Sequence, residues 1–186
     1  MSESLVKNRS ILNQAQLACY LFAACPTFQK IVGAVDELDA RNHAHDIRIL
    51  VEEFEDDIDG FDQPPYVLCS KNGAETSFDQ IADGVFGGQG QVVCQFVTRW
   101  DPEIPKSLAH REHENVVGEI VAEALAISSE RRDLLGYADR THLHVTSMTQ
   151  VASPYEIDYA ERDMTHPTAG NAPVFFYDEW RLTHPT

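Results

Sequence analysis

The pattern of hydrophobic and polar residues predicts two amphipathic helices and four strands. The first helix is expected from Ser10, which can cap it, and its apolar residues follow the three- and four-residue spacing of a helical face: Ile11, Ala15, Ala18, Phe22 and Cys25. Further apolar residues widen this face, so we expect the helix to be buried on most sides, against a sheet or a neighbouring subunit. Pro26 interrupts the pattern, and Gly33 is expected to end its last turn.

A second helix is predicted to begin between Pro105 and His110 and to run to about Ser129. Its buried stripe has the same helical spacing and consists of Val117, Ile120, Val121, Ala124, Leu125 and Ser128. Glutamates at positions 112, 114, 119 and 123 fall outside that stripe and are expected to face water.

The four strands are predicted from apolar or alternating runs of residues: Tyr66–Ser70, Gln91–Trp100, His142–Glu156 and Val174–His184. Two prolines stand just before the first of these runs, a position that a strand tolerates. Together the elements predict a single α+β domain over residues 1–186, with a mainly antiparallel four-stranded sheet and the two helices packed on one of its faces.

Three segments interrupt these elements. Residues 36–62 form a strongly acidic insertion, in which the run from Ile47 to Phe54 could be a short strand. Residues 71–90 are rich in glycine and are predicted to form a long mobile loop, and residues 158–172 form a long polar connection between the last two strands. The glycines do not form a phosphate-binding loop, because no Lys-Ser/Thr pair and no predicted helix follows Gly90.

Charge excludes several classes of function. The chain has 14 basic and 30 acidic residues, a formal net charge of −16 and a pI near 4.7, so it lacks the basic surface that grips nucleic acid. The longest apolar stretch, Leu17–Cys25, is far shorter than the ~20 residues of a membrane span. The first residues do not have the pattern of a secretory signal peptide. We therefore expect a soluble cytoplasmic protein that does not enter membranes.

The four cysteines carry no visible chemistry. They stand at positions 19, 25, 69 and 94 without the CxxC spacing of metal or redox sites, and each lies in an apolar run. Buried free thiols are the expected outcome in a reducing compartment.

Several histidines are candidate metal ligands. His113 and Glu114 begin like the HExxH motif of zinc proteases, but Val117 replaces the second histidine, and His110 with His113 fits an exposed first helical turn. Two pairs of histidines, each two positions apart, are stronger candidates for metal ligands, because residues two apart on a strand point to the same side of the sheet. These pairs are His43 with His45 and His142 with His144.

The acidic run from Glu55 to Gly60 resembles part of a calcium-binding loop. Asp57, Asp59 and Gly60 occupy its third, fifth and sixth positions, but Tyr66 stands where the loop needs a bidentate glutamate. A solvated acidic tract explains these residues better. No complete catalytic motif is present, so we expect no enzymatic activity, no cofactor and no metal.

The order of the elements resembles that of the tail terminator, or tail completion, proteins of long-tailed bacteriophages. The similarity rests on the opening helix, the Pro-Pro-Tyr-Val-Leu strand at residues 64–68, the strand from Gly90 to Trp100 that ends in an aromatic residue, the helix from about His110 and the paired closing strands. It covers most of the chain. The acidic insertion and the connection at 158–172 depart from the family pattern.

This resemblance implies a structural virion protein rather than an enzyme. Six copies would form a ring on the end of the tail tube in the tail or neck of the virion, after assembly in the cytoplasm of the host bacterium. One face of the ring would meet the tail tube protein and the other the head-tail connector or stopper protein. Double-stranded DNA would pass through the ring without sequence-specific contact, and the acidic charge would keep it from sticking.

Two groups of residues are candidates for the interfaces of such a ring. Asp56, Asp57 and Asp59 are candidates for a charged ring surface. Phe78, Val85 and Phe86 are apolar residues in a glycine-rich segment, and they are candidates for docking on a partner.

Two alternative functions remain open from the sequence. The first is a head-completion or neck protein of the portal complex, which would also form a ring. The second is a small metal-dependent hydrolase that uses His142 and His144 together with His43 or His45.

Overall fold

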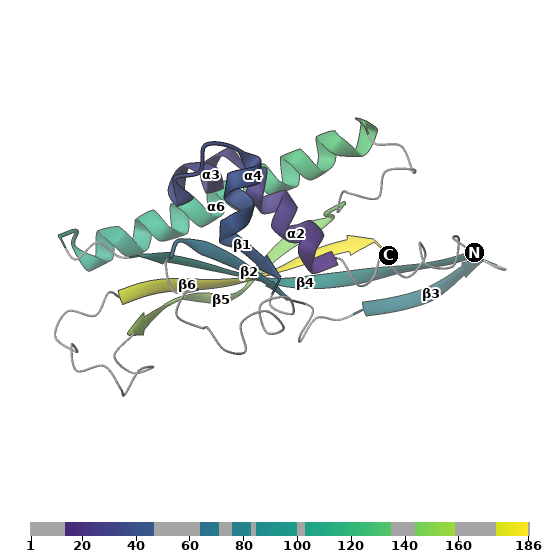
Figure 1. Cartoon of the computed structure of the whole chain (residues 1–186). Helices are drawn as coiled ribbons and strands as arrows, with labels where there is room; N and C mark the ends of the chain where they lie inside the picture. The colour runs from purple at the N-terminus through teal and green to yellow at the C-terminus, as the bar shows by residue number, and fades with distance from the viewer. Residues whose placement is uncertain are drawn as a thin grey trace, which may run out of the picture.

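The computed structural model describes residues 14–46, 64–70, 76–82, 85–99, 103–134, 144–158 and 174–185. These residues form an α+β fold, in which the helices lie on one face of a sheet (Figure 1). The predicted fold class and the placement of the helices on one face are therefore confirmed, whereas the numbers of strands and helices differ from the prediction.

Four α-helices lie within the described residues, where the sequence predicts two. They are α2 (Gln14–Ala23), α3 (Pro26–Val32), α4 (Glu37–Ala40) and α6 (Lys106–Leu134), and the short 3-10 helix η1 (Arg41–His43) follows α4. Pro26 begins a separate helix instead of breaking the last turn of the first one, because proline at a first helical position already has a helical φ angle. Ser10, the predicted cap of the first helix, lies outside the described residues.

Gly33 ends α3 as predicted. Its φ angle of 71° is left-handed, and such a residue closes a helix at little steric cost when it is glycine. The amide of Ala34 donates to the carbonyl of Gln29 at 2.9 Å, and the amide of Gly33 donates to the carbonyl of Lys30 at 3.3 Å. The chain then turns back toward α4.

Within the described part of the chain the sheet has six strands, where the sequence predicts four. They are β1 (Ala44–Asp46), β2 (Tyr66–Ser70), β3 (Thr76–Ala82), β4 (Val85–Arg99), β5 (Ser147–Asp158) and β6 (Val174–Pro185). The order is β1-β2-β4-β6-β5, with β3 pairing only with β4. All pairs are antiparallel except β1 with β2, so the sheet is mixed.

The glycine-rich segment predicted as a mobile loop contains two of these strands. β3 and the first residues of β4 form an antiparallel hairpin, in which Gly87, Gly88 and Gly90 stand opposite Asp79, Phe78 and Thr76. The prediction was wrong because glycine has no side chain, and three glycines in six residues hide the alternation by which a strand is recognised.

The acidic insertion was also only partly predicted. Its first residues fold into α4, η1 and β1, and Ala40 and Ala44 belong to the hydrophobic core. β1 is three residues long, too short for its alternation to stand out from the acidic residues around it. The strand proposed for Ile47–Phe54 lies outside the described residues.

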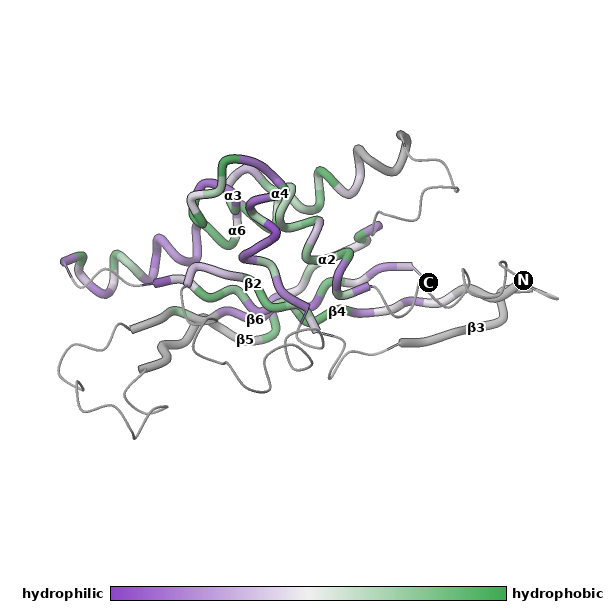
Figure 2. The backbone as a smooth tube through the Cα atoms, in the orientation of Figure 1, coloured by the Kyte–Doolittle hydropathy of each residue, from purple (hydrophilic) through white to green (hydrophobic). Residues whose placement is uncertain are grey.

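The core lies between the helices and the middle of the sheet, where Figure 2 shows hydrophobic residues on α2, β2 and β4. Val92, Cys94 and Phe96 alternate along β4 and face the helices, and Val67 of β2 stands opposite Phe96. The ring of Phe22 meets the ring of Phe96 edge-on at 5.1 Å between centroids. Replacing a fully buried phenylalanine such as Phe22 by alanine costs about 3–5 kcal/mol.

The remaining predictions are close to the structure. β2 has the predicted bounds, and the Pro64–Pro65 peptide bond before it is cis. β4 starts earlier than predicted, α6 ends later, and β5 begins at Ser147 instead of His142. None of the helices in the described ranges is long and apolar enough to cross a membrane.

Candidate functional site

The most unusual feature of the fold is a two-stranded extension of the sheet. β2 pairs with β4 only over Val93–Val97, and β6 pairs with it over Gln89–Arg99. Residues 85–88 of β4 therefore pair with β3 alone. We call β3 together with residues 85–90 of β4 the arm. Figure 1 shows the arm continuing past the layer of helices.

Among the described strands, the arm has two edges without a neighbour, which we call its open edges. At Gln89 and Gly90, β4 pairs with β3 on one side and with β6 on the other, so β3 lies on the edge of β4 opposite β6. Beyond the end of β6, the second edge of β4 over residues 85–88 has no neighbour among the described strands, and neither does the outer edge of β3. Unpaired backbone groups at such edges can accept another strand.

The arm contains three of the predicted interface residues. Phe78 stands opposite Gly88, and Phe86 stands opposite Gln80, so positions 78 and 86 fall on the same face of the hairpin. Val85 stands opposite Ala82 near the turn. The docking role of these residues stays a prediction, but they belong to a defined element instead of a loop. Asp56, Asp57 and Asp59 lie outside the described residues.

A second notable surface is a fixed apolar corner between α3 and α4. The side chains of Val35 and Leu38 are 89% and 70% exposed, the largest exposures among the large hydrophobic residues whose burial is described. We call these two residues the apolar corner. The Asp36 carboxylate accepts a hydrogen bond from the amide of Asp39 at 2.9 Å, and the Asp39 carboxylate accepts one from the amide of Val35 at 3.1 Å. This reciprocal capping holds the corner in one conformation.

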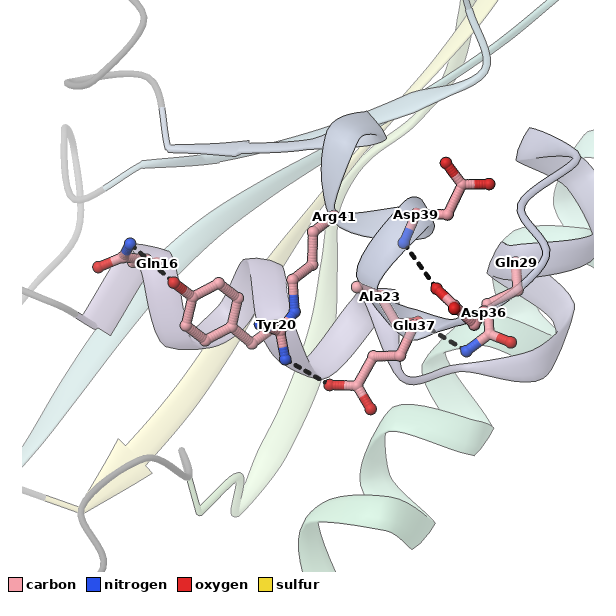
Figure 3. A network of polar contacts seen from close by, with 8 residues as sticks. All are labelled: Gln16, Tyr20, Ala23, Gln29, Asp36, Glu37, Asp39 and Arg41. Atoms are coloured by element: carbon pink, nitrogen blue, oxygen red, sulfur yellow. Dashed lines mark hydrogen bonds and ion pairs between the residues drawn. The ribbon is translucent and has the colours of Figure 1, made fainter.

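The same corner is tied to α2 through Arg41 (Figure 3). The Arg41 guanidinium forms an ion pair with Glu37 at 2.8 Å and lies over the ring of Tyr20, 4.3 Å from its centroid. Tyr20 in turn accepts a hydrogen bond from Gln16 at 2.9 Å. The ion pair is partly exposed and contributes little alone, but together with the stacking it fixes α4 against α2.

α6 is joined to the sheet by a buried histidine. Nδ1 of His113 lies 2.7 Å from the Thr98 hydroxyl of β4, and its ring packs on Phe176 of β6 with 5.7 Å between centroids. Burial, with a smaller contribution from the nearby charge of His110, lowers the pKa of His113 to about 4. His113 is therefore neutral at physiological pH and acts as a structural contact.

Asp178 lies on the same side of the sheet and is 1% exposed. Its carboxylate accepts hydrogen bonds from Trp180 Nε1 at 2.9 Å and from Gln150 Nε2 at 3.1 Å. Burial raises the pKa of Asp178, the negative charge of Glu114 adds to the rise, and the two donors oppose it. These contacts join β5 and β6 beneath α6.

The structure brings no three of the metal-site candidates together within the described residues. No group of three or more His, Cys, Asp or Glu residues that could hold a metal occurs within the described part of the chain. His43 lies in η1 and His45 in β1, where its ring meets Tyr66 edge-on. Burial, with the charge of His43, lowers the pKa of His45 to about 4. His142 lies outside the described residues, so the pair that it would form with His144 stays a prediction.

All four cysteines are free and buried, as the sequence predicts. A chain of thiol contacts joins Cys19 of α2 to Cys69 of β2 and Cys69 to Cys94 of β4. The contact with Cys69 and burial raise the pKa of Cys19, and burial raises the pKa of Cys69. The thiolate is the reactive form of cysteine, and a raised pKa leaves little of it at neutral pH. These residues therefore act as apolar packing between α2 and the sheet.

No family model matches the chain, and no curated protein matches its sequence.

Two features of the site cannot be predicted from the sequence. The apolar corner consists of two hydrophobic residues among acidic ones, and two residues are too few to show a helical or strand period. Nothing in the sequence shows that their side chains stay exposed. The open edges of the arm depend on where β6 stops along β4, which is a matter of register between distant segments. The absence of charge over residues 85–98 is a signal that could have extended the predicted strand at Gln91–Trp100 back toward Val85.

Proposed function

We propose that this chain is a structural subunit of the tail terminator type. In this proposal six copies form a ring that caps the tail tube of a long-tailed bacteriophage, ends tail polymerisation and joins the tail to the head-side connector. The ring acts by steric blocking and by binding, without catalysing a reaction. The observation that carries the proposal is the arm, whose two open edges extend from the end of the sheet.

A closed ring of identical subunits needs two different contact surfaces on each copy. Its interfaces are heterologous, so a surface at one side of a subunit meets another surface of its neighbour. The arm and the apolar corner belong to different elements, and the exposed surface of each does not stabilise an isolated monomer. Exposed apolar residues held in a fixed conformation and unpaired strand edges are both typical of assembly surfaces.

The charge of the chain fits a ring through which DNA passes. Each subunit contributes a formal net charge of −16, so a ring of six repels the phosphate backbone instead of binding it. Retention of duplex DNA by the purified ring at low salt tests this part of the proposal. Free passage is expected, and tight binding at low salt would contradict it.

The partners in this proposal are the tail tube protein on one side and the connector or stopper protein on the other. A head-completion protein of the neck would use the same ring architecture but would bind the portal complex. Co-sedimentation of the purified protein with polymerised tail tubes, in parallel with portal complexes, separates the two. Binding to the tubes alone supports the terminator, and binding to the portal alone contradicts it.

The ring itself is tested by the native mass of the protein. Light scattering, first without and then with tail tubes, measures whether copies associate, and electron microscopy of the tube ends shows whether they form a cap. A mass of about six chains of 20.9 kDa, or about 125 kDa, is expected in at least one of these conditions.

A further inference from the structure

The edges of the sheet differ in how well they are protected. β1, at one end, is three residues long, and β5, at the other end, has register shifts between Gln150 and Ala152 and between Ala152 and Tyr155. Short edge strands and bulges are the devices by which proteins prevent edge-to-edge pairing. The arm has one register shift, between Gln80 and Ala82 of β3, whereas the free edge of residues 85–88 of β4 carries none within the described residues.

The arm carries little charge for an acidic chain. Residues 85–98 contain no charged side chain, and β3 contains one, Asp79. Two copies with a net charge of −16 each repel one another, so contact between copies is most favourable where charge is absent. Backbone pairing is suited to such a contact, because it needs no complementary charges.

We infer that the open edge of β4 over residues 85–88 pairs with the outer edge of β3 in a second copy of this chain. This inference rests on the proposed ring and names the contact that closes it. Each copy has both edges, one on either side of its arm, so head-to-tail pairing uses every open arm edge once the ring is closed. A two-stranded hairpin alone is marginally stable in water, and the neighbouring strands stabilise it.

Hydrogen exchange followed by mass spectrometry tests the pairing without knowledge of its register. Amides on the open edges exchange in the dilute monomer and become protected in the ring. The rates for peptides covering residues 76–90 should fall by about tenfold, the factor that corresponds to one net backbone hydrogen bond. Peptides from Tyr66–Ser70, which pair on both sides within the monomer, serve as the control and should not change.

Two single proline variants locate the contact on β4. Successive residues of a strand direct their amides to opposite edges, so Gly87→Pro and Gly88→Pro remove one amide facing β3 and one facing the open edge. The variant that loses the amide facing β3 should have a less stable monomer. The variant that loses the amide facing the open edge should keep a stable monomer but fail to associate. Association that survives in both variants would overturn the inference.

An arm-deleted variant keeps the test independent of local strain. Thr76 stands opposite Gly90, so an Asn-Gly turn can replace residues 77–89 and leave the body of the sheet in place. Its monomer should unfold cooperatively, and its tendency to form rings should be lost. If this variant still forms rings that cap tail tubes, the inference fails and the proposed function stands. If the full chain neither forms rings nor binds tubes, the proposed function itself fails.

Discussion

Glu123 of α6 caps the first turn of α3 through Thr27. Its two carboxylate oxygens accept hydrogen bonds from the Thr27 amide at 2.9 Å and from the Thr27 hydroxyl at 2.6 Å. Cys25, at the N-cap position, provides no side-chain cap of its own, so a residue almost a hundred positions away satisfies a donor at the start of α3. The contact fixes α3, and the apolar corner that follows it, against the long helix.

Removing this cap should destabilise the protein. Glu123→Ala leaves the Thr27 amide without its acceptor and removes a negative charge from a helix N-terminus, at an expected cost of about 1–2 kcal/mol. Urea unfolding followed by circular dichroism measures the change. Glu119→Ala, an exposed glutamate one turn earlier on α6, should change the free energy of unfolding by less than about 0.5 kcal/mol. Equal effects of the two substitutions would contradict the capping role.

The contact between Thr98 and His113 is expected to hold α6 on the sheet. Thr98→Val keeps the shape of the side chain but leaves Nδ1 of a buried histidine without its partner, which costs about 1–3 kcal/mol. Thermal unfolding at pH 7 measures the loss. Thr149→Val, on an exposed position of β5, is the matched control and should be close to neutral. A neutral Thr98→Val would show that the hydroxyl contributes nothing.

Stability should fall as the pH is lowered from about 6.5 toward 4. The pKa of His113 is about 4 in the folded protein and 6.5 in its ordinary state, so the unfolded chain binds the proton more readily in this range. His113 therefore contributes stability above pH 6.5 and loses it as the pH falls, with a limit of about 3 kcal/mol. Unfolding in urea at several pH values should give a shallower slope for His113→Gln than for the unmodified chain. Parallel slopes would contradict the shift.

The buried thiols should react slowly in the folded protein. Burial raises the pKa of Cys69, and contact with the Cys69 thiol raises the pKa of Cys19. Little thiolate is therefore present on these two residues at pH 8. A chromogenic disulfide reagent should label these cysteines slowly in buffer and rapidly in urea. Rapid labelling of the native protein would show that they are exposed to solvent on this timescale.

The apolar corner should contribute to association and not to folding. Replacing both Val35 and Leu38 by serine removes exposed apolar surface, so the free energy of unfolding of the monomer should change by no more than about 0.5 kcal/mol. If the corner lies in the ring interface, the same variant should weaken association by about tenfold or more, or about 1.4 kcal/mol. Val151→Ser, at an exposed position of β5, is the control. Unchanged association would exclude the corner from the interface.

The sequence predicts the elements that have a strong local signal. α6 is long and keeps its period over many turns, and β2 is an apolar run set off by two prolines, so both were predicted at nearly their observed positions. α3 was missed as a separate helix because Pro26 can either end one helix or begin another. The backbone conformation before Pro26 determines whether the proline ends one helix or begins the next.

The candidate site depends on features that local patterns do not record. Apolar residues in a polar segment drew attention to Phe78, Val85 and Phe86, but the glycines beside them concealed the strands. The open edges result from the register between β4 and β6, whose sequences are about 80 residues apart. Register of this kind is set by packing of the whole sheet, which no short stretch of sequence determines.

Light scattering of the purified chain, with and without tail tubes, is the most direct test of a ring-forming subunit. The account predicts a mass of about six chains, either in free solution or on the tubes, with density capping the tube ends in electron micrographs. A mass of 20.9 kDa at every concentration, together with bare tube ends, would contradict it.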